Sequence, residues 1–136
     1  IVDALYLSGD FRKTEEYLKK ELEKSPVNDD LLIYLAQTEA AIGNERTALK
    51  IFAKYDSLPL IYWRRHEFEY QRDYLEARIY ALLGKKDQAI ALLRKALEKG
   101  QLCHYHDFGR DIFLKSLFDH PAFREIIKPT ESSESL

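Results

Sequence analysis

Apolar residues recur along this chain in three- and four-residue steps, which is the spacing of one face of an α-helix. Three such stripes are Phe11, Thr14, Leu18 and Leu22; Ala48, Ile51, Phe52 and Tyr55; and Ala89, Ile90, Leu93, Ala96 and Leu97. Apolar or small residues also precede the last two stripes, at Leu32, Leu35, Ala36 and Ile42, and at Ala77, Tyr80, Ala81 and Leu83. The pattern predicts an all-α chain.

Three glycines punctuate the helical stripes. Gly9 and Gly43 are 34 positions apart, and Gly43 and Gly84 are 41 apart. Each glycine suits a helix C-cap in the left-handed conformation, where a side chain would be strained. The repeating unit is therefore a helix, a glycine turn and a second helix, and the first copy is incomplete at its start.

These units resemble the tetratricopeptide repeat, whose 34-residue signature has a Leu-Gly pair, a Tyr, an Ala-x3-Phe step and a Pro. Leu35-Ala36 and Ala48 with Phe52 match in one unit, although Glu39 replaces the signature Tyr. The corresponding matches in the next unit are Ala77, Tyr80, Ala89 and Leu93, and those in the partial first unit are Thr14, Leu18 and Pro26.

The second glycine interval is seven residues longer than the first, about two helical turns. Leu58-Pro59-Leu60 should end one helix and begin the next, since proline is tolerated in a first turn. No Gly or Pro interrupts residues 60–83. The sequence therefore predicts one long helix, Ile61 to Leu83, that overhangs the stack.

The pattern changes after Gly100. Residues 101–128 contain Asp111 to Leu117 and then Asp-His-Pro-Ala-Phe from Asp119. This resembles the closing segment of many bacterial tetratricopeptide proteins, which implies capping helices. Asp119 is expected to N-cap the last helix and Pro121 to lie in its first turn, while Phe123, Ile126 and Ile127 cover the end of the stack.

The resemblance implies a right-handed α–α superhelix, a solenoid of helical hairpins with C-terminal capping helices. Its parts are a partial repeat at 1–28, a repeat at 29–62, a repeat with an elongated first helix at 63–100, capping helices at 101–128 and a flexible tail at 129–136. The first helices of such repeats line a groove that holds a peptide or helix. The groove positions implied here are Tyr34, Gln37, Ala41, Gln71, Tyr74 and Arg78, with Asp3 and Leu7 in the incomplete repeat.

One subset of the family grips a peptide carboxylate with asparagines. Tyr34 and Leu75 stand in their places here, so that mode of binding is not expected. The segment Ile61 to Tyr70 holds the sole Trp, at position 63, and an Arg pair at 64 and 65. Trp, Tyr and Arg are enriched in interface hot spots, so Trp63 and Arg64 are candidate partner contacts. The alternative is that the aromatic residues only cover the neighbouring hairpin.

Composition and charge argue against several classes of function. A net charge of −2 gives no basic patch for nucleic acid, and no stretch is apolar enough to span a membrane. No phosphate loop or nucleophile motif occurs, so neither catalysis nor a cofactor is expected. Cys103, His104, His106 and Asp107 crowd into five positions and converge poorly for a metal, so a surface or capping role is favoured over a zinc site. Glu15 and Glu16, four residues from Lys19 and Lys20, suggest solvated ion pairs.

The chain contains no methionine and opens on Ile-Val-Asp-Ala-Leu, so we expect it to be the C-terminal part of a longer protein. The favoured function is a non-catalytic interaction module for a protein or peptide partner. The alternative is a structural domain that packs on another domain of the same parent chain or forms a homodimer.

Overall fold

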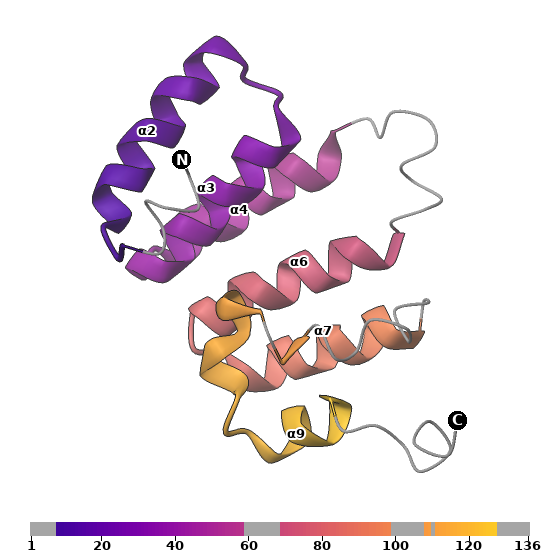
Figure 1. The fold of residues 1–136 in the computed structure, drawn as a ribbon. Helices are drawn as coiled ribbons and strands as arrows, with labels where there is room; N and C mark the ends of the chain where they lie inside the picture. Colours follow the sequence, from indigo (N-terminus) through magenta and orange to yellow (C-terminus); the bar gives the residue numbers. More distant parts are fainter. Residues whose placement is uncertain (1–7, 59–68, 99–107, 110, 128–136) are drawn as a thin grey trace. The chain divides into compact units, whose positions relative to one another are not determined.

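A computed structural model describes residues 8–58, 69–98, 108–109 and 111–127 (Figure 1). Within these ranges the secondary structure is helical and contains no strand, which confirms the predicted all-α class. The helices are α2 (Phe11–Lys24), α3 (Asp29–Ile42), α4 (Glu45–Ser57), α6 (Glu69–Leu82), α7 (Lys86–Glu98), the 3-10 helix η2 (Ile112–Leu117) and α9 (Pro121–Ile127). The chain divides into two compact units, Ile1–Glu67 and Phe68–Leu136.

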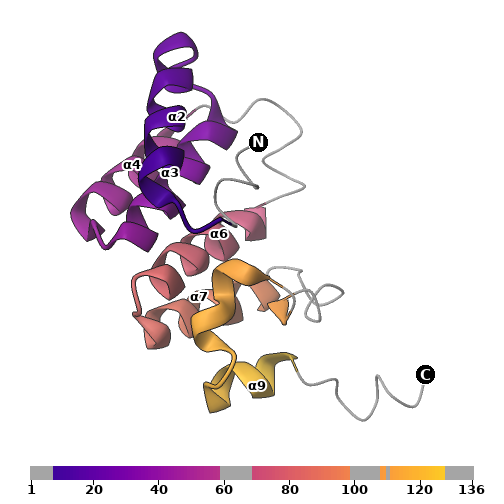
Figure 2. The ribbon, with the colours of Figure 1, turned by 60° about the vertical axis from the view of Figure 1, so that its left-hand side comes forward.

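In the first unit α3 is the central helix and packs against both α2 and α4 (Figures 1 and 2). Between positions 32 and 40 of α3, every residue except Tyr34 is buried. Burial on all sides is expected of a helix with neighbours on more than one face. The flanking helices contribute Thr14 and Leu18 from α2 and Ala48 and Phe52 from α4, and these residues confirm the two predicted stripes.

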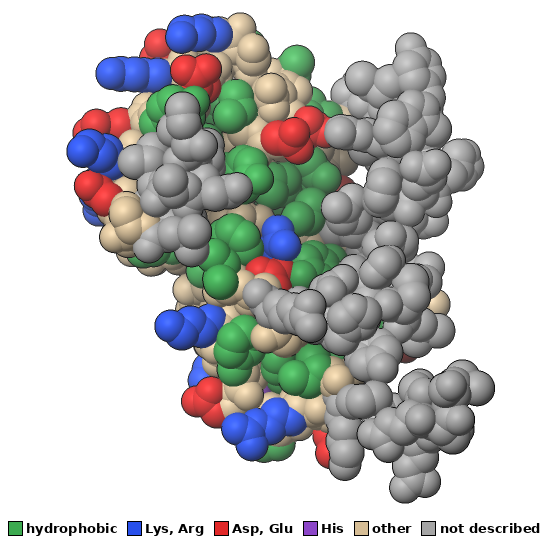
Figure 3. All heavy atoms as spheres, in the orientation of Figure 1, with side chains coloured by type: hydrophobic (Ala, Val, Ile, Leu, Met, Phe, Trp, Pro, Cys, Tyr) green, Lys and Arg blue, Asp and Glu red, His purple; other side chains and the backbone are tan. Residues whose placement is uncertain are grey.

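The ends of the first unit's helices have local chemical causes. The Asp10 carboxylate accepts the Lys13 N–H at 3.1 Å to cap α2, and the Asn28 amide oxygen accepts the Leu31 N–H at 3.1 Å to cap α3. Helix α4 ends at Ser57, as Pro59 predicted. Side chains of both charges alternate over the outer face of α2 (Figure 3), where Lys24 pairs with Glu21 at 3.5 Å.

Two glycines end helices by the same hydrogen-bonding pattern. Gly43 has φ of 101° and Gly84 has φ of 79°, both in the left-handed region. The N–H of Asn44 donates to the Glu39 carbonyl at 2.9 Å, and that of Lys85 donates to the Tyr80 carbonyl at 2.9 Å. Each glycine N–H also donates to the carbonyl three residues back, which completes a Schellman motif. The predicted turns at Gly43 and Gly84 are thus confirmed, and Gly9 also has a positive φ, of 80°.

In the second unit α6 packs against α7 and η2, and α9 contacts α7. The apolar core is drawn from all four helices and from Phe108. Its buried members are Tyr74, Ala77, Ala81, Ala89, Ile90, Leu93, Ala96, Phe108, Leu114, Leu117 and Phe123. The predicted stripe of α7 is therefore confirmed. The Ser116 hydroxyl also donates to the Ala81 carbonyl at 2.7 Å, which gives this acceptor in the last turn of α6 a second hydrogen bond.

The closing segment differs from the sequence prediction in one detail. Helix α9 begins at Pro121 as expected, but its N-cap is His120 and not Asp119. The His120 Nδ1 accepts the Ala122 N–H at 3.1 Å, and the His120 carbonyl accepts the Arg124 N–H at 3.1 Å. Proline at the first helical position makes the preceding residue the cap, and this residue is His120. Phe123 is fully buried and stacks on Phe118, with ring centroids 5.8 Å apart.

Several predictions fall on residues outside the described ranges. Of the predicted long helix, Ile61 to Leu83, the structure describes Glu69–Leu82 as α6. Asp3, Leu7, Trp63, Arg64, Cys103, His104, His106 and Asp107 lie outside the description. Among the helices that are described, none combines the length and the apolarity that crossing a bilayer requires.

Candidate functional site

The predicted groove positions of the first unit lie on α3 at a helical spacing of three and four residues. Tyr34 and Ala41 are half-buried, so part of each side chain is accessible. Gln37, between them, is only 1% exposed. The structure therefore brings the three positions to one helix and leaves the two outer ones half-buried.

Gln37 is unusual because its amide is buried without compensation. Within the part of the chain that the structure describes, neither Oε1 nor Nε2 of Gln37 has a hydrogen-bond partner. A buried polar group in this state costs roughly 1–3 kcal/mol of stability. The predicted site therefore contains a donor and an acceptor that no described residue satisfies.

In the second unit, two of the predicted positions meet at Asp111. The Tyr74 hydroxyl and the Arg78 Nε both donate to Asp111 Oδ2, the second at 2.7 Å. Asp111 Oδ1 accepts the Phe113 N–H at 2.9 Å. Asp111 is the N-cap of η2, so these hydrogen bonds connect the start of η2 to α6.

Aromatic rings enclose the same cluster. The Tyr74 ring lies 5.0 Å from that of Phe108, and the Arg78 guanidinium lies 4.8 Å from the centroids of both Tyr74 and Phe113. Burial, helped by the charge of Asp111, raises the pKa of Tyr74 far above its usual value, so the hydroxyl stays protonated as a donor. Tyr74 is 8% exposed, and its described contacts are internal to the second unit. The side chain of Gln71 lies outside the description.

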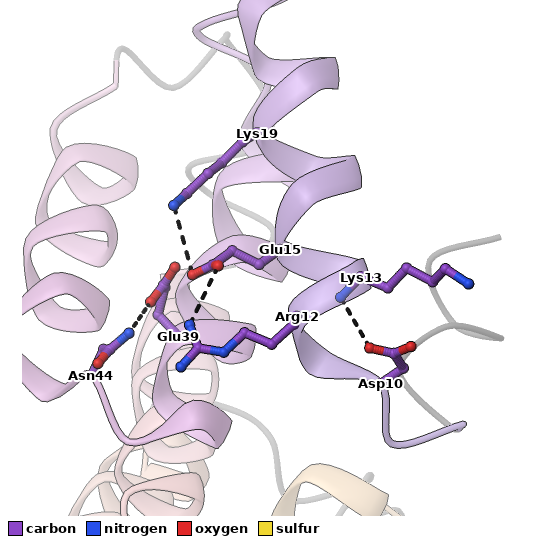
Figure 4. A network of polar contacts seen from close by, with 7 residues as sticks. All are labelled: Asp10, Arg12, Lys13, Glu15, Lys19, Glu39 and Asn44. Atoms are coloured by element: carbon purple, nitrogen blue, oxygen red, sulfur yellow. Dashed lines mark hydrogen bonds and ion pairs between the residues drawn. The ribbon is translucent and has the colours of Figure 1, made fainter.

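A second polar cluster joins α2 to α3 and was not anticipated from the sequence. Glu15 makes the expected pair with Lys19, and also one with Arg12, each at 3.7 Å. Glu15 is not a fully solvated residue, however, because its side chain is 13% exposed and points at the carboxyl group of Glu39 (Figure 4). The signal in the sequence was Glu39 itself, a carboxylate within the otherwise mostly apolar α3.

Metal-ligating residues do not converge in the described part of the chain, where no group of three or more His, Cys, Asp or Glu side chains could hold an ion. Comparison of the chain with protein-family models, with curated proteins and with solved structures found no match.

Proposed function

We propose that this chain is an interaction module of the tetratricopeptide type, whose hairpins stack in a right-handed superhelix and hold a peptide or helix of a protein partner. The observation that carries the proposal is that one hairpin design occurs in both units. In each, the fifth residue after the glycine of the turn is a fully buried alanine, Ala48 or Ala89. A large apolar residue follows four positions later, Phe52 at 3% exposure or Leu93 at 0%.

Repetition of this design supports a binding role for a physical reason. A single hairpin cannot hide its apolar stripe, so repeats bury a continuous core by stacking and leave a face lined by their first helices. On α3 that face carries Tyr34 and Ala41, both half-buried. Tyrosine provides a large, rigid contact area at low entropic cost, which is typical of interface hot spots.

The test uses the full chain with a photo-crosslinking residue in place of Tyr34. The captured partner is identified and purified, and its dissociation constant is measured against unmodified protein, Tyr34→Ala and Lys50→Ala. Lys50 is exposed on α4, so Lys50→Ala is the control. We expect Tyr34→Ala to weaken binding by about tenfold or more, as truncation of a hot-spot tyrosine does, and Lys50→Ala to leave it unchanged. Equal affinities for all three proteins would contradict use of the α3 face.

The alternative function, self-association, gives a different result in sedimentation. A chain that binds only a foreign partner should sediment as a monomer at every concentration. A mass that rises toward the dimer with concentration would favour the second copy of the chain as the partner.

A further inference from the structure

Glu39 is a buried carboxyl group with an incomplete set of partners. It is 1% exposed, and its Oε2 accepts a hydrogen bond from Asn44 Nδ2 at 2.7 Å. For Oε1, no donor is found among the described residues. Figure 4 shows that the group facing Glu39 across the α2–α3 contact is the carboxyl of Glu15.

Two ionised carboxylates that face each other at a buried position destabilise each other. Burial disfavours the charged form of an acid, and a second negative charge beside it disfavours that form further. A single neutral amide, that of Asn44, does not compensate a buried anion. If Glu39 instead carries a proton on Oε1, that atom becomes a donor, and the facing Glu15 oxygen is its acceptor.

Glu15 is the member of the pair that is stabilised as an anion. Lys19 Nζ and Arg12 Nη1 each lie 3.7 Å from one of its oxygens. Both cations are on α2, whereas the groups that act on Glu39 are Glu15 and Lys19 from α2 and Asn44 from the turn before α4. The positive charge thus lies nearer to Glu15 and the neutral donor nearer to Glu39.

We infer that Glu39 and Glu15 share one proton at pH values where isolated glutamates are ionised, so that a protonated Glu39 donating to Glu15 holds α2 against α3 and makes this contact sensitive to pH. The inference concerns a conformational device within the first unit and is independent of any partner.

The direction of the pH dependence follows from the two acids. Burial, and then the hydrogen bond with Glu15, raise the pKa of Glu39; the hydrogen bond with Glu39 lowers the pKa of Glu15, with help from Lys19 and Arg12. The contribution of Glu39 is complete below its unfolded pKa, about 4.3, and is lost as pH rises through its raised folded pKa. That of Glu15 is present above its unfolded pKa and is lost as pH falls through its lowered one. The α2–α3 contact is therefore most stable between the two folded values.

The test is a pH titration of the full chain, followed by carbon NMR of the glutamate carboxyl groups. We expect the Glu39 signal to titrate above 4.3, the value of an exposed glutamate, because burial and the facing Glu15 raise the pKa of Glu39. In Glu15→Gln the midpoint should move down, because the facing anion has gone. Glu16→Gln, at an exposed neighbouring position of α2, is the control and should leave the midpoint in place. A Glu39 midpoint at the exposed value, or one unmoved by Glu15→Gln, would overturn the inference.

Thermal unfolding of Glu39→Gln gives an independent measurement. The amide keeps a donor toward Glu15 but cannot ionise. Its melting temperature should therefore stay level as pH rises from glutamate's unfolded pKa through the raised pKa of Glu39, where that of the unmodified chain falls. An equally steep fall in both proteins would also overturn the inference. Should Glu39→Gln not fold, the NMR titrations of the unmodified chain and of Glu15→Gln decide the question.

Discussion

At the scale of single residues, the buried polar groups differ most in how well they are satisfied. Asp111 accepts three hydrogen bonds, from Tyr74, Arg78 and the Phe113 backbone. Glu39 accepts one from Asn44 and faces another acid, while the Gln37 amide has none among the described residues. The satisfied Asp111 therefore stabilises the fold, whereas burial of the Gln37 amide lowers the free energy of unfolding.

Gln37→Met should stabilise the protein. Methionine is similar in length and has no amide to desolvate, so we expect a gain of about 1 kcal/mol in the free energy of unfolding. Urea unfolding measures this gain. A loss of stability would mean that the amide has a partner in the native protein.

Asp111→Ala should destabilise the protein by about 3 kcal/mol, because it leaves a buried hydroxyl, a guanidinium and a backbone N–H without their acceptor. Tyr74→Phe removes one of these bonds and should cost about 1 kcal/mol. The exposed Asp119, which does not cap α9, provides the control, and Asp119→Ala should stay within about 0.5 kcal/mol. Denaturant unfolding measures the free energy of unfolding of these three variants. If Asp111→Ala lowered the free energy of unfolding no more than Tyr74→Phe does, Asp111 would not be the shared acceptor of the three donors.

At the scale of elements, the hairpins depend on two left-handed residues. A Cβ added at Gly43 or Gly84 would meet no atom of the described residues within 4 Å, so these residues leave space for a side chain there. The requirement comes from the positive φ, which an L side chain adopts only with strain.

Gly43→Ala and Gly84→Ala should therefore each cost about 1–2 kcal/mol in the free energy of unfolding. Gly43→Asn is the matched comparison, because asparagine tolerates the left-handed region better than alanine, and it should recover part of the loss. Thermal or urea unfolding measures the series. If alanine and asparagine were equally tolerated without cost, the turn at Gly43 would have a different backbone from the one described.

Features that depend on neighbours in the sequence were predictable, and features that depend on distant residues were not. The helical stripes and the turns at Gly43 and Gly84 follow from local spacing and backbone sterics. The Tyr74–Asp111 bond joins residues 37 positions apart, and nothing near Tyr74 in the sequence indicates it. The Glu15–Glu39 pair likewise needs α2 and α3 to be packed before it exists. The cap of α9 was misplaced by one residue because Asp119 and His120 can both accept an N-terminal N–H.

At the scale of the whole molecule, the chain comprises two compact units that share a hairpin design. The proposed superhelix requires these hairpins to stack as consecutive repeats, because only stacking creates the groove in which Tyr34 would meet a partner. Lys54 and Lys95 occupy equivalent positions in the last turns of α4 and α7, and both are exposed. They offer matched attachment points, one in each unit.

The most direct measurement is the distance between spin labels at Lys54→Cys and Lys95→Cys, with Cys103→Ser to remove the native thiol. Packed helices lie about 8–10 Å apart, so stacked repeats predict one narrow distribution at roughly 10–20 Å between the labelled backbones. Labelled single-cysteine proteins serve as controls for association between chains. A broad distribution reaching far beyond this range would show that the hairpins do not stack and would contradict the account.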